Sequence, residues 1–369
     1  MGERIVVLGG GIIGLATAFE CQRRGYKVTI LEKVTCGGQA SGAAAGMLAP
    51  YSEIEEDPDD FFRLCLASLK LYPKWQQEVK DIAKAEFEYT NSGSLHCVYH
   101  EADLLSLESR QQWQGDFGAE ADILQGEELY KREPELSKEI IAAMYYPEES
   151  HVFAPDYVKA LEQACRNIGV QIYEQLEQVD VVNWEEEIHL VAKDGQSFTG
   201  DRLVICSGAW ASELEGTFGL SIPVHPIRGQ ICAYDMPVGK VKHILYSSQG
   251  YLVPKGNGTL VNGASEDIAG FNTTVTERGI RRLTNWNKNV LPYLANEIPF
   301  HEWAGLRPAT QDGYPLIGKL STAPHVIFAT GHYRNGILLS PVTAHIVADL
   351  LEGQRDRVPL QMFAPERFS

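Results

Sequence analysis

The sequence lacks the cysteine patterns that hold small secreted proteins together. Its seven cysteines are an odd number spread over 369 residues, and no two of them form a C-x-x-C pair. A disulfide framework or a cysteine-based zinc site is therefore not expected, and this usage fits a reducing cytoplasm. The H-E-x-x-H motif is also absent, so we expect no metal site.

Long apolar runs and an excess of basic residues are missing too. No stretch approaches the roughly 18 apolar residues of a membrane span, so we expect no membrane partner. Residues 5–19 resemble the apolar core of a signal peptide, but glycines at 9, 10, 11 and 14 interrupt them. Lys and Arg number 32 against 49 Asp and Glu, which gives a net charge of −17. Such a charge repels phosphate backbones, so nucleic acid is not an expected partner either.

What remains is the composition of a globular chain, with 44% apolar and 22% charged residues. The pattern predicts a strand over residues 4–9, a helix over 11–24 and a second strand over 27–31. This βαβ order implies a parallel sheet with a right-handed crossover. Strand-rich middle sections and a final strand and helix, over 325–329 and 337–351, indicate an α/β chain of two interleaved domains.

The first strand, turn and helix contain a G-x-G-x-x-G pattern at Gly9, Gly11 and Gly14. The three glycines permit a tight turn, a close approach to a pyrophosphate and packing of the helix on the sheet. Glu32 ends the second strand, at the distance where such a pattern places a ribose-binding carboxylate. These features favour FAD or NAD without a 2′-phosphate. A glycine turn without a ligand is the alternative.

A run of small residues, CGGQASGAAAGMLA over 36–49, follows the second strand. Small side chains there would let the backbone lie against a flat ring or a second phosphate, which favours FAD over NAD. A flexible loop explains the same composition, and residues 43–48 could also start a helix.

Two later segments are candidates for the rest of the site. Arg307 lies in WAGLRP among apolar and small residues, and its planar guanidinium matches a carboxylate in bidentate fashion. A structural ion pair with one of the many acidic residues is the alternative. The turn TGHYRNG at 330–336 again joins a strand to a helix, whose positive end would favour the flavin edge that gains charge on reduction. A simple βα connection explains this turn equally.

The N-terminal glycine pattern, SGAAAGML, WAGLRPAT and GHYRNGILLSP occur together in one chain. In this combination the sequence resembles the D-amino-acid oxidase superfamily, and within it the glycine oxidases of the thiamine-biosynthesis type, over essentially its whole length. The resemblance implies noncovalent FAD and a Rossmann-like FAD-binding domain formed by residues 1–85, 147–220 and 302–369. It implies a second, smaller α+β substrate-binding domain, built on an antiparallel sheet, over residues 86–146 and 221–301.

The resemblance also assigns roles to individual residues. It implies that Arg307 holds the substrate carboxylate, that Tyr251 lines the substrate pocket, and that Arg334 lies near flavin and substrate. The implied FAD contacts are Gly9, Gly11, Ile12, Ile13, Gly14, Glu32, Lys33, Ala40, Ser41, Ala45, Gly46, Met47, Gln178, Gly208, His332, Tyr333, Arg334, Asn335, Gly336, Ile337 and Leu338.

Three positions depart from the family pattern. Gln249 stands where the family has a histidine two residues before the pocket tyrosine. Glu266 stands where a pocket methionine is expected, and Gln178 replaces a flavin-contacting valine. A carboxylate at position 266 would change the preference for particular amines, unless the loop carries it out of the pocket.

The expected activity is oxidation of glycine and other small amines by FAD and O2, yielding glyoxylate, ammonia and hydrogen peroxide. The glycine imine would supply thiazole formation in thiamine biosynthesis, and the resemblance implies a homo-oligomer, specifically a tetramer. Three alternatives stay open: a sarcosine or D-amino-acid oxidase, an FAD-dependent dehydrogenase that uses another electron acceptor, and a flavin-binding protein without turnover.

Overall fold

A six-stranded sheet forms the first half of the molecule, a computed structural model that describes residues 2–54, 58–354 and 358–369. Neighbouring strands are parallel except for the first pair. In spatial order the strands are β19 (Leu316–Lys319), β20 (Val326–Thr330), β13 (Arg202–Ile205), β1 (Arg4–Leu8), β2 (Lys27–Leu31) and β9 (Gln171–Tyr173). The βαβ order inferred from the N-terminal residues is confirmed by β1, β2 and the helix between them.

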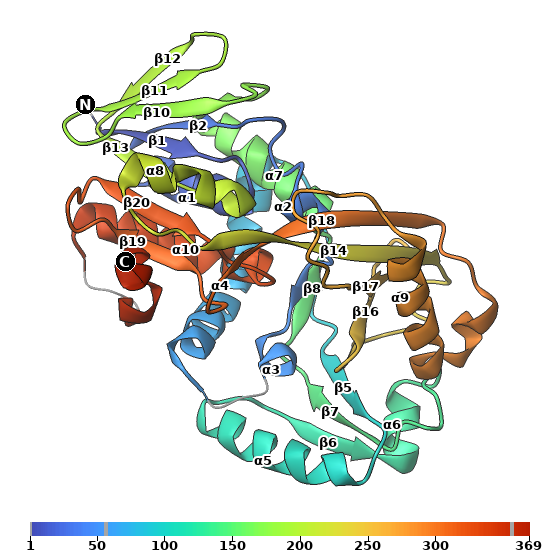
Figure 1. Cartoon of the computed structure of the whole chain (residues 1–369). Coiled ribbons are helices and arrows are strands. Elements are labelled where there is room, and N and C mark those ends of the chain that lie inside the picture. The colour runs from blue at the N-terminus through green and yellow to red at the C-terminus, as the bar shows by residue number, and fades with distance from the viewer. Residues whose placement is uncertain (1, 55–57, 355–357) are drawn as a thin grey trace.

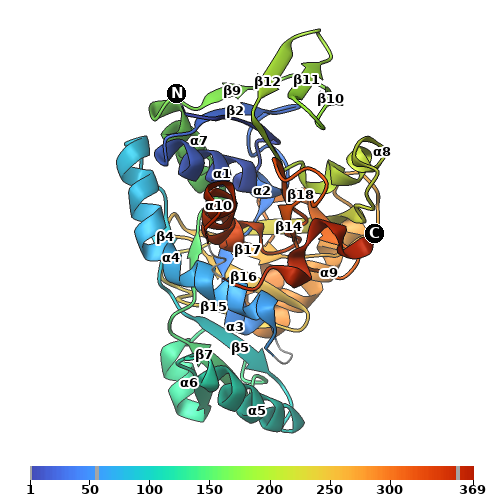
Figure 2. The same ribbon diagram turned by 90° about the vertical axis from the view of Figure 1, so that its left-hand side faces the viewer.

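Both faces of this sheet are covered, which explains why β1 is apolar along most of its length. Ile5 and Val7 point toward a layer of helices, whereas Val6 and Leu8 point toward a small antiparallel sheet. The helices are α1 (Ile12–Arg23), α4 (Asp60–Ala83), α7 (Ala154–Asn167) and α10 (Gly336–Glu352), which lie together in Figure 2. The small sheet consists of β10 (Val179–Asn183), β11 (Ile188–Ala192) and β12 (Ser197–Gly200).

The second half is a mixed, largely antiparallel sheet of eight strands. In spatial order they are β18 (His301–Thr310), β14 (Val224–Asp235), β17 (Thr259–Gly263), β16 (Gly250–Pro254), β15 (Ile244–Ser247), β5 (Ser94–Val98), β7 (Ala142–Tyr146) and β6 (Asp122–Gln125). Helices α6 (Gly126–Arg132) and α9 (Glu277–Val290) share one apolar core with this sheet, and α5 (Ala102–Asp116) packs in another. The expected α/β fold with a second domain on an antiparallel sheet is therefore confirmed.

The long strands β14 and β18 cross the middle of the molecule and pair over ten positions (Figure 1). β18 pairs in the eight-stranded sheet, although it belongs to the segment 302–369 that was expected in the FAD-binding domain. The division of the chain into the two domains at the expected boundaries stays a prediction.

The small-residue run does not form the helix considered for residues 43–48. It forms the single turn α2 (Ala40–Ala43) and then β3 (Met47–Leu48), which joins β8 (Ser150–Val152) and β4 (Tyr89–Thr90) in a short sheet. Between this turn and β3, Gly46 takes a φ of +80°, a conformation that would strain other residues. The one-turn helices α3 (Pro50–Glu53) and α8 (Glu215–Phe218) complete the α-helices described.

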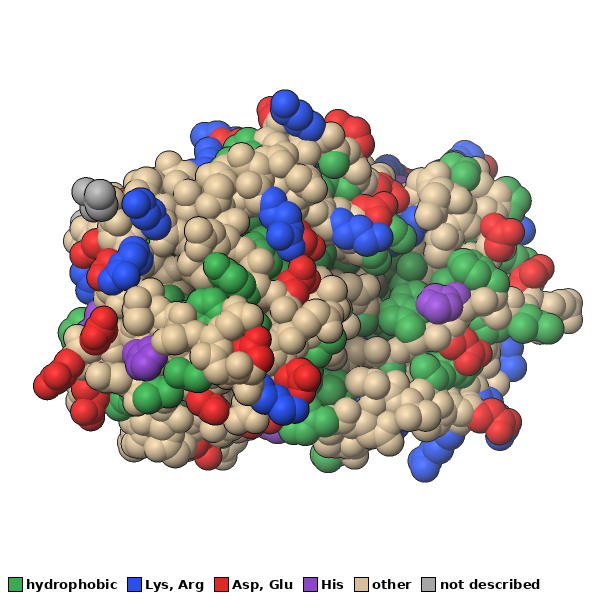
Figure 3. All heavy atoms as spheres, turned by 90° about the horizontal axis from the view of Figure 1, so that it is seen from above, with side chains coloured by type: hydrophobic (Ala, Val, Ile, Leu, Met, Phe, Trp, Pro, Cys, Tyr) green, Lys and Arg blue, Asp and Glu red, His purple; other side chains and the backbone are tan. Residues whose placement is uncertain are grey.

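Acidic and basic side chains lie next to one another on the face in Figure 3, without a continuous patch of either sign. No helix among the described residues has the length and apolar character that crossing a bilayer requires.

Candidate active site

A single cavity of about 660 Å³ runs from the carboxyl ends of β1 and β2 to the middle of β18. At one end it is lined by the glycine turn and Glu32, and along its length by residues 37–47. At the other end lie Tyr251, Arg307 and Arg334. Segments far apart in the sequence thus build one elongated site at the edge of a parallel sheet, where such folds bind dinucleotides.

The glycine turn allows α1 to approach β1 closely. Gly9 has a φ of +112°, and a side chain on Gly14 would place its Cβ 1.9 Å from the Gly9 carbonyl oxygen. The backbone N–H of Ile12, in the first turn of α1, donates to Ser41 Oγ at 2.9 Å. The positive end of the helix and the small-residue run therefore meet at one place in the cavity wall.

Glu32 is held in a fixed orientation at the end of β2. One carboxylate oxygen accepts the N–H of Gly10 at 2.8 Å, and the other accepts the N–H of Val34 at 2.8 Å. Each oxygen keeps a further lone pair, so the carboxylate can still accept hydrogen bonds from a ribose diol.

The small-residue run is anchored rather than loose, which contradicts its interpretation as a flexible loop. Trp303 Nε1 donates to the Ala43 carbonyl at 2.9 Å. Lys255 Nζ donates to the carbonyls of Ala45 and Val152 at 2.8 and 2.9 Å. Small size matters here because a Cβ on Gly305 would come within 2.7 Å of the Ala43 methyl group.

Arg307 lies within β18, and its guanidinium is packed over the neighbouring strand β14. A Cβ on Gly229 would lie 2.5 Å from the guanidinium, so only glycine fits beneath it. Nη1 donates to the Ser265 carbonyl at 3.0 Å. Among the described residues no carboxylate lies within the 4.0 Å of an ion pair. Arg307 therefore forms no structural ion pair with any residue that the structure describes, contrary to the alternative considered from the sequence.

Tyr251 lies beside Arg307 on β16. Its ring rests on Gly263, where a Cβ would lie 2.5 Å from the hydroxyl oxygen. Burial raises the pKa of Tyr251, although the charges of Arg307 and Arg334 oppose this shift. The hydroxyl is therefore protonated at neutral pH and can donate to an anion held by Arg307.

Arg334, in the turn before α10, lies among acidic groups. The charge of Glu53 is the largest influence that raises the pKa of Arg334, and Glu266 adds to it. The distance from Arg334 Nη1 to Glu266 Oε1 is 3.6 Å, and Nη2 lies 3.4 Å from the Tyr246 hydroxyl. Burial in turn raises the pKa of Glu53. The charge of Glu53 acts on both arginines, but among the described residues only Arg334 has a carboxylate within ion-pair distance.

Most residues named from the sequence line this cavity, including Gln178 and Gly208. Three do not. Gly14 faces the Gly9 carbonyl inside the fold, and Leu338 is buried with its carbonyl accepting the Ser68 hydroxyl. Asn335 also lies outside the lining. Gln249 is exposed and outside the lining too, so its departure from the family pattern does not alter the cavity wall.

Glu53 and Trp210 are among the lining residues that were not singled out from the sequence. Glu53, at the end of α3, is one of 49 acidic residues and stands in no motif. Trp210 lines the cavity near Lys33, where its ring stacks on Phe271 and lies 5.7 Å from the Lys33 ammonium. Only its place after the strand and glycine turn over 203–208 could have pointed to it.

The fold and this cavity define a flavin-dependent oxidoreductase: residues 4–350 match the model of the FAD dependent oxidoreductase family, and the chain belongs to that family. Its cofactor is FAD. The chain is 33% identical to a glycine oxidase of Geobacillus kaustophilus, over 98% of this chain and 96% of the relative. A crystal structure of glycine oxidase from that organism superimposes with a TM-score of 0.93, at 32% identity and 99% coverage of both chains. A bifunctional protein ThiO/ThiG of Synechocystis is also 33% identical, and the chain spans 54% of its length.

The residues present fit FAD. The turn of Gly9 and Gly11 leaves room for a pyrophosphate, because nothing but Ser41 Oγ lies near the position of a Cβ on Gly11. Glu32 is oriented for a ribose, and the small-residue run forms a flat wall between the two ends of the cavity. The N-terminus of α10, with Gly336 and Ile337 in the lining, turns its positive end toward the cavity, where it would favour negative charge on a bound cofactor.

Proposed function

We propose that this chain catalyses the oxidative deamination of glycine and other small amines: glycine, water and O2 give glyoxylate, ammonia and H2O2. The observation that carries the proposal is Arg307, an arginine in the FAD cavity without a carboxylate partner among the described residues. Such a guanidinium suits the carboxylate of a small amino acid. The names of the full-length relatives support glycine as a substrate.

In this proposal Arg307 binds the substrate carboxylate in bidentate fashion and Tyr251 donates a further hydrogen bond. Both side chains rest on glycine backbone, so the bound amino acid is held in one orientation relative to the flavin. Arg334 interacts with the Glu53 and Glu266 carboxylates and so offsets part of their negative charge beside the substrate. No side chain is required to remove a proton from carbon, and we assign none.

FAD, held without a covalent bond, would accept the two electrons lost from the amine. Gly9, Gly11, Ile12 and Ile13 would hold the pyrophosphate, and Glu32 the ribose. Residues Lys33, Ala40, Ser41, Ala45, Gly46, Met47, Gln178 and Gly208 would line the cofactor. The run His332, Tyr333, Arg334, Gly336 and Ile337 would lie at the flavin edge, where the positive end of α10 stabilises negative charge.

We further propose that the chain acts in the cytoplasm as a homo-oligomer, specifically a tetramer, and that its imine product supplies thiazole formation in thiamine biosynthesis. The likeness to ThiO/ThiG supports the second statement. Sedimentation of the purified holoprotein tests the oligomeric state, and a monomer would contradict the proposed homo-oligomer.

The visible absorbance of the holoprotein before and after anaerobic addition of glycine tests the activity. We expect bleaching with glycine, followed by recovery of colour and formation of peroxide when air is admitted. No bleaching with any small amine would refute the proposal. Faster bleaching by sarcosine or a D-amino acid would identify a sarcosine or D-amino-acid oxidase, and bleaching without peroxide in air would identify a dehydrogenase.

A further inference from the structure

The short segment after β17 places one more carboxylate, that of Glu266, at the outer edge of the substrate end of the cavity. The segment is fixed on both sides of this residue. Asp267 exchanges two backbone hydrogen bonds with Arg228 of β14, at 3.0 and 2.9 Å. Ser265 N donates to the Gln230 carbonyl at 3.1 Å. The backbone of Glu266 is therefore held in place by the sheet that carries Arg307.

The Glu266 side chain faces two residues of the cavity wall. Oε1 accepts the Tyr333 hydroxyl at 2.8 Å and lies 3.6 Å from Arg334 Nη1. The side chain is 49% exposed and does not line the cavity itself, whereas Tyr333 and Arg334 do. Glu266 thus lies at the rim of the substrate end of the cavity, in contact with two lining residues.

The charges at this end of the cavity already balance. The guanidinium groups of Arg307 and Arg334 are offset by the carboxylates of Glu53 and Glu266, and among these four residues Arg334 forms an ion pair with Glu266. A zwitterionic amino acid with one carboxylate keeps this balance. A second carboxylate on the same substrate would find both arginines engaged and would face Glu266 at the rim, where like charges repel.

We propose that Glu266 is a specificity-determining residue that restricts the substrates to amines with a single carboxylate and an uncharged substituent. The proposal rests on the proposed function in one respect only, that Arg307 binds the substrate carboxylate. It names the class of amines that the site rejects: dicarboxylates, even where their size matches an accepted substrate.

The test compares sarcosine with iminodiacetate, which carries an added carboxylate, in the holoenzyme and in Glu266→Gln. The amide keeps an oxygen that accepts the Tyr333 hydroxyl, so the variant removes the charge and retains the contact. We expect wild type to favour sarcosine strongly, and the ratio of kcat/KM for iminodiacetate to that for sarcosine to rise about tenfold in the variant. Glu302→Gln, an exposed position on β18, removes the same charge elsewhere and should leave the ratio unchanged.

A binding measurement separates this inference from the activity. Dissociation constants of malonamate and malonate, near-isosteric acids with one and two carboxylates, can be read from the flavin absorbance without turnover. Glu266→Gln should tighten malonate relative to malonamate by about tenfold. Unchanged ratios in both measurements, or wild-type enzyme that accepts iminodiacetate as readily as sarcosine, would overturn the role of Glu266. Failure to oxidise any small amine would instead refute the proposed function, and the binding ratio would still test Glu266.

Discussion

Among single residues, Arg307 has the most direct consequence for catalysis. Removal of one member of a charged, bidentate contact costs about 2–5 kcal/mol of binding. We therefore expect Arg307→Ala to raise the KM for glycine by about a hundredfold or more while FAD stays bound. Steady-state kinetics and the flavin spectrum of the purified variant measure the two effects. An unchanged KM would show that another group holds the carboxylate.

The residue scale also shows what a sequence can reveal about a site. Arg307, Tyr251 and Arg334 are recognisable because each stands in a distinctive local pattern. Glu53 is not, since its role depends on the close approach of α3 to the turn before α10, which no local pattern encodes. Glu266 was noticed only as a departure from a pattern, and its place at the rim follows from the pairing of Asp267 with β14.

At the scale of elements, the packing of α1 on β1 depends on Gly14. A methyl group there would lie 1.9 Å from the Gly9 carbonyl oxygen, so the helix would have to move away from the turn. We expect Gly14→Ala to be purified without FAD or with greatly weakened binding, as measured by flavin content and fluorescence titration.

Gly115 provides the matched control for this change. It lies in α5, and nothing lies within 4 Å of a Cβ built there. Alanine at this position should leave FAD binding intact and stabilise the helix by about 0.5–1 kcal/mol. Equal flavin content in both variants would contradict the role given to Gly14.

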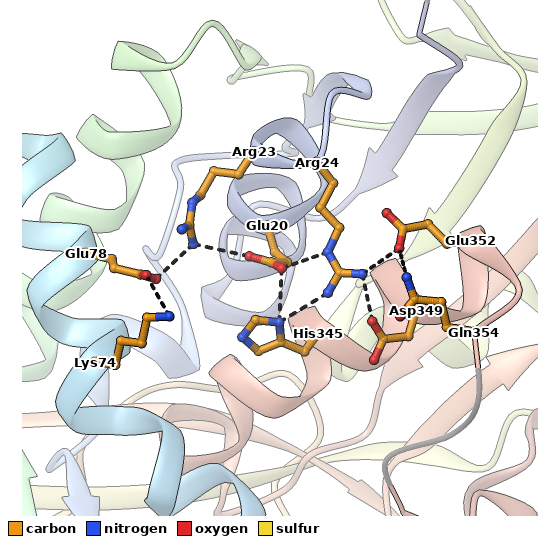
Figure 4. A network of polar contacts seen from close by, with 9 residues as sticks. All are labelled: Glu20, Arg23, Arg24, Lys74, Glu78, His345, Asp349, Glu352 and Gln354. Carbon is orange, nitrogen blue, oxygen red and sulfur yellow. Dashed lines mark hydrogen bonds and ion pairs between the residues drawn. The ribbon is translucent and has the colours of Figure 1, made fainter.

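Helices α1, α4 and α10 are joined by a polar network around Glu20 (Figure 4). Glu20 pairs with Arg24 at 2.8 Å and with His345 at 3.0 Å, and Arg24 continues to Asp349 at 2.7 Å. Arg23 links the same carboxylate to Glu78 of α4. The network thus holds α1, α4 and α10 together at the surface of the helix layer.

This network predicts a pH dependence of stability. Burial alone would raise the pKa of Glu20, but hydrogen bonds from His345 and Arg24 outweigh it and lower the value to about 2. A lowered pKa means that the carboxylate stabilises the fold above about pH 4.5, and that this stabilisation disappears as the pH falls toward 2. Glu20→Gln should lose about 2 kcal/mol of unfolding free energy at pH 7, roughly half of that at pH 3 and little at pH 2.

Urea unfolding of both proteins across this pH range measures the difference. The exposed Glu277, paired only with Arg281 of its own helix, gives a control in Glu277→Gln. This control should show no such trend. A constant difference between wild type and Glu20→Gln at all pH values would contradict the assignment.

The elements also mark the limit of sequence-based prediction of this fold. Strands and helices with strong periodicity, such as β1, α1 and α10, lie within a few residues of their expected positions. The run of small residues over 36–49 was ambiguous, because a segment without large side chains has no apolar pattern. Its conformation is set instead by partners distant in sequence, namely Trp303 and Lys255.

At the scale of the whole molecule, Lys255 connects the eight-stranded sheet to the wall of the cofactor cavity. Its ammonium group is buried and reaches the carbonyls of Ala45 and Val152. Burial lowers the pKa of Lys255 to about 7. The unfolded chain binds this proton up to about pH 10.4, so the fold gains stability as the pH rises from 7.

We therefore expect Lys255→Met to change the pH dependence of stability. Relative to this variant, the unfolding free energy of wild type should rise by about 2 kcal/mol between pH 7 and pH 9. Denaturant unfolding at several pH values provides the measurement. Because both proteins contain the same cysteines, the contribution of cysteine titration to the pH dependence cancels in the difference between them. A difference that does not grow with pH would contradict the buried, readily deprotonated state of Lys255.

The support that Gly229 and Gly263 give to Arg307 and Tyr251 has a consequence for how this enzyme could change. Both side chains lie directly against main chain, so a side chain added at Gly229 or Gly263 would displace them. Directed evolution toward new amines would therefore leave Arg307 and Tyr251 unchanged. We expect its productive mutations at the rim of the cavity, beginning with Glu266.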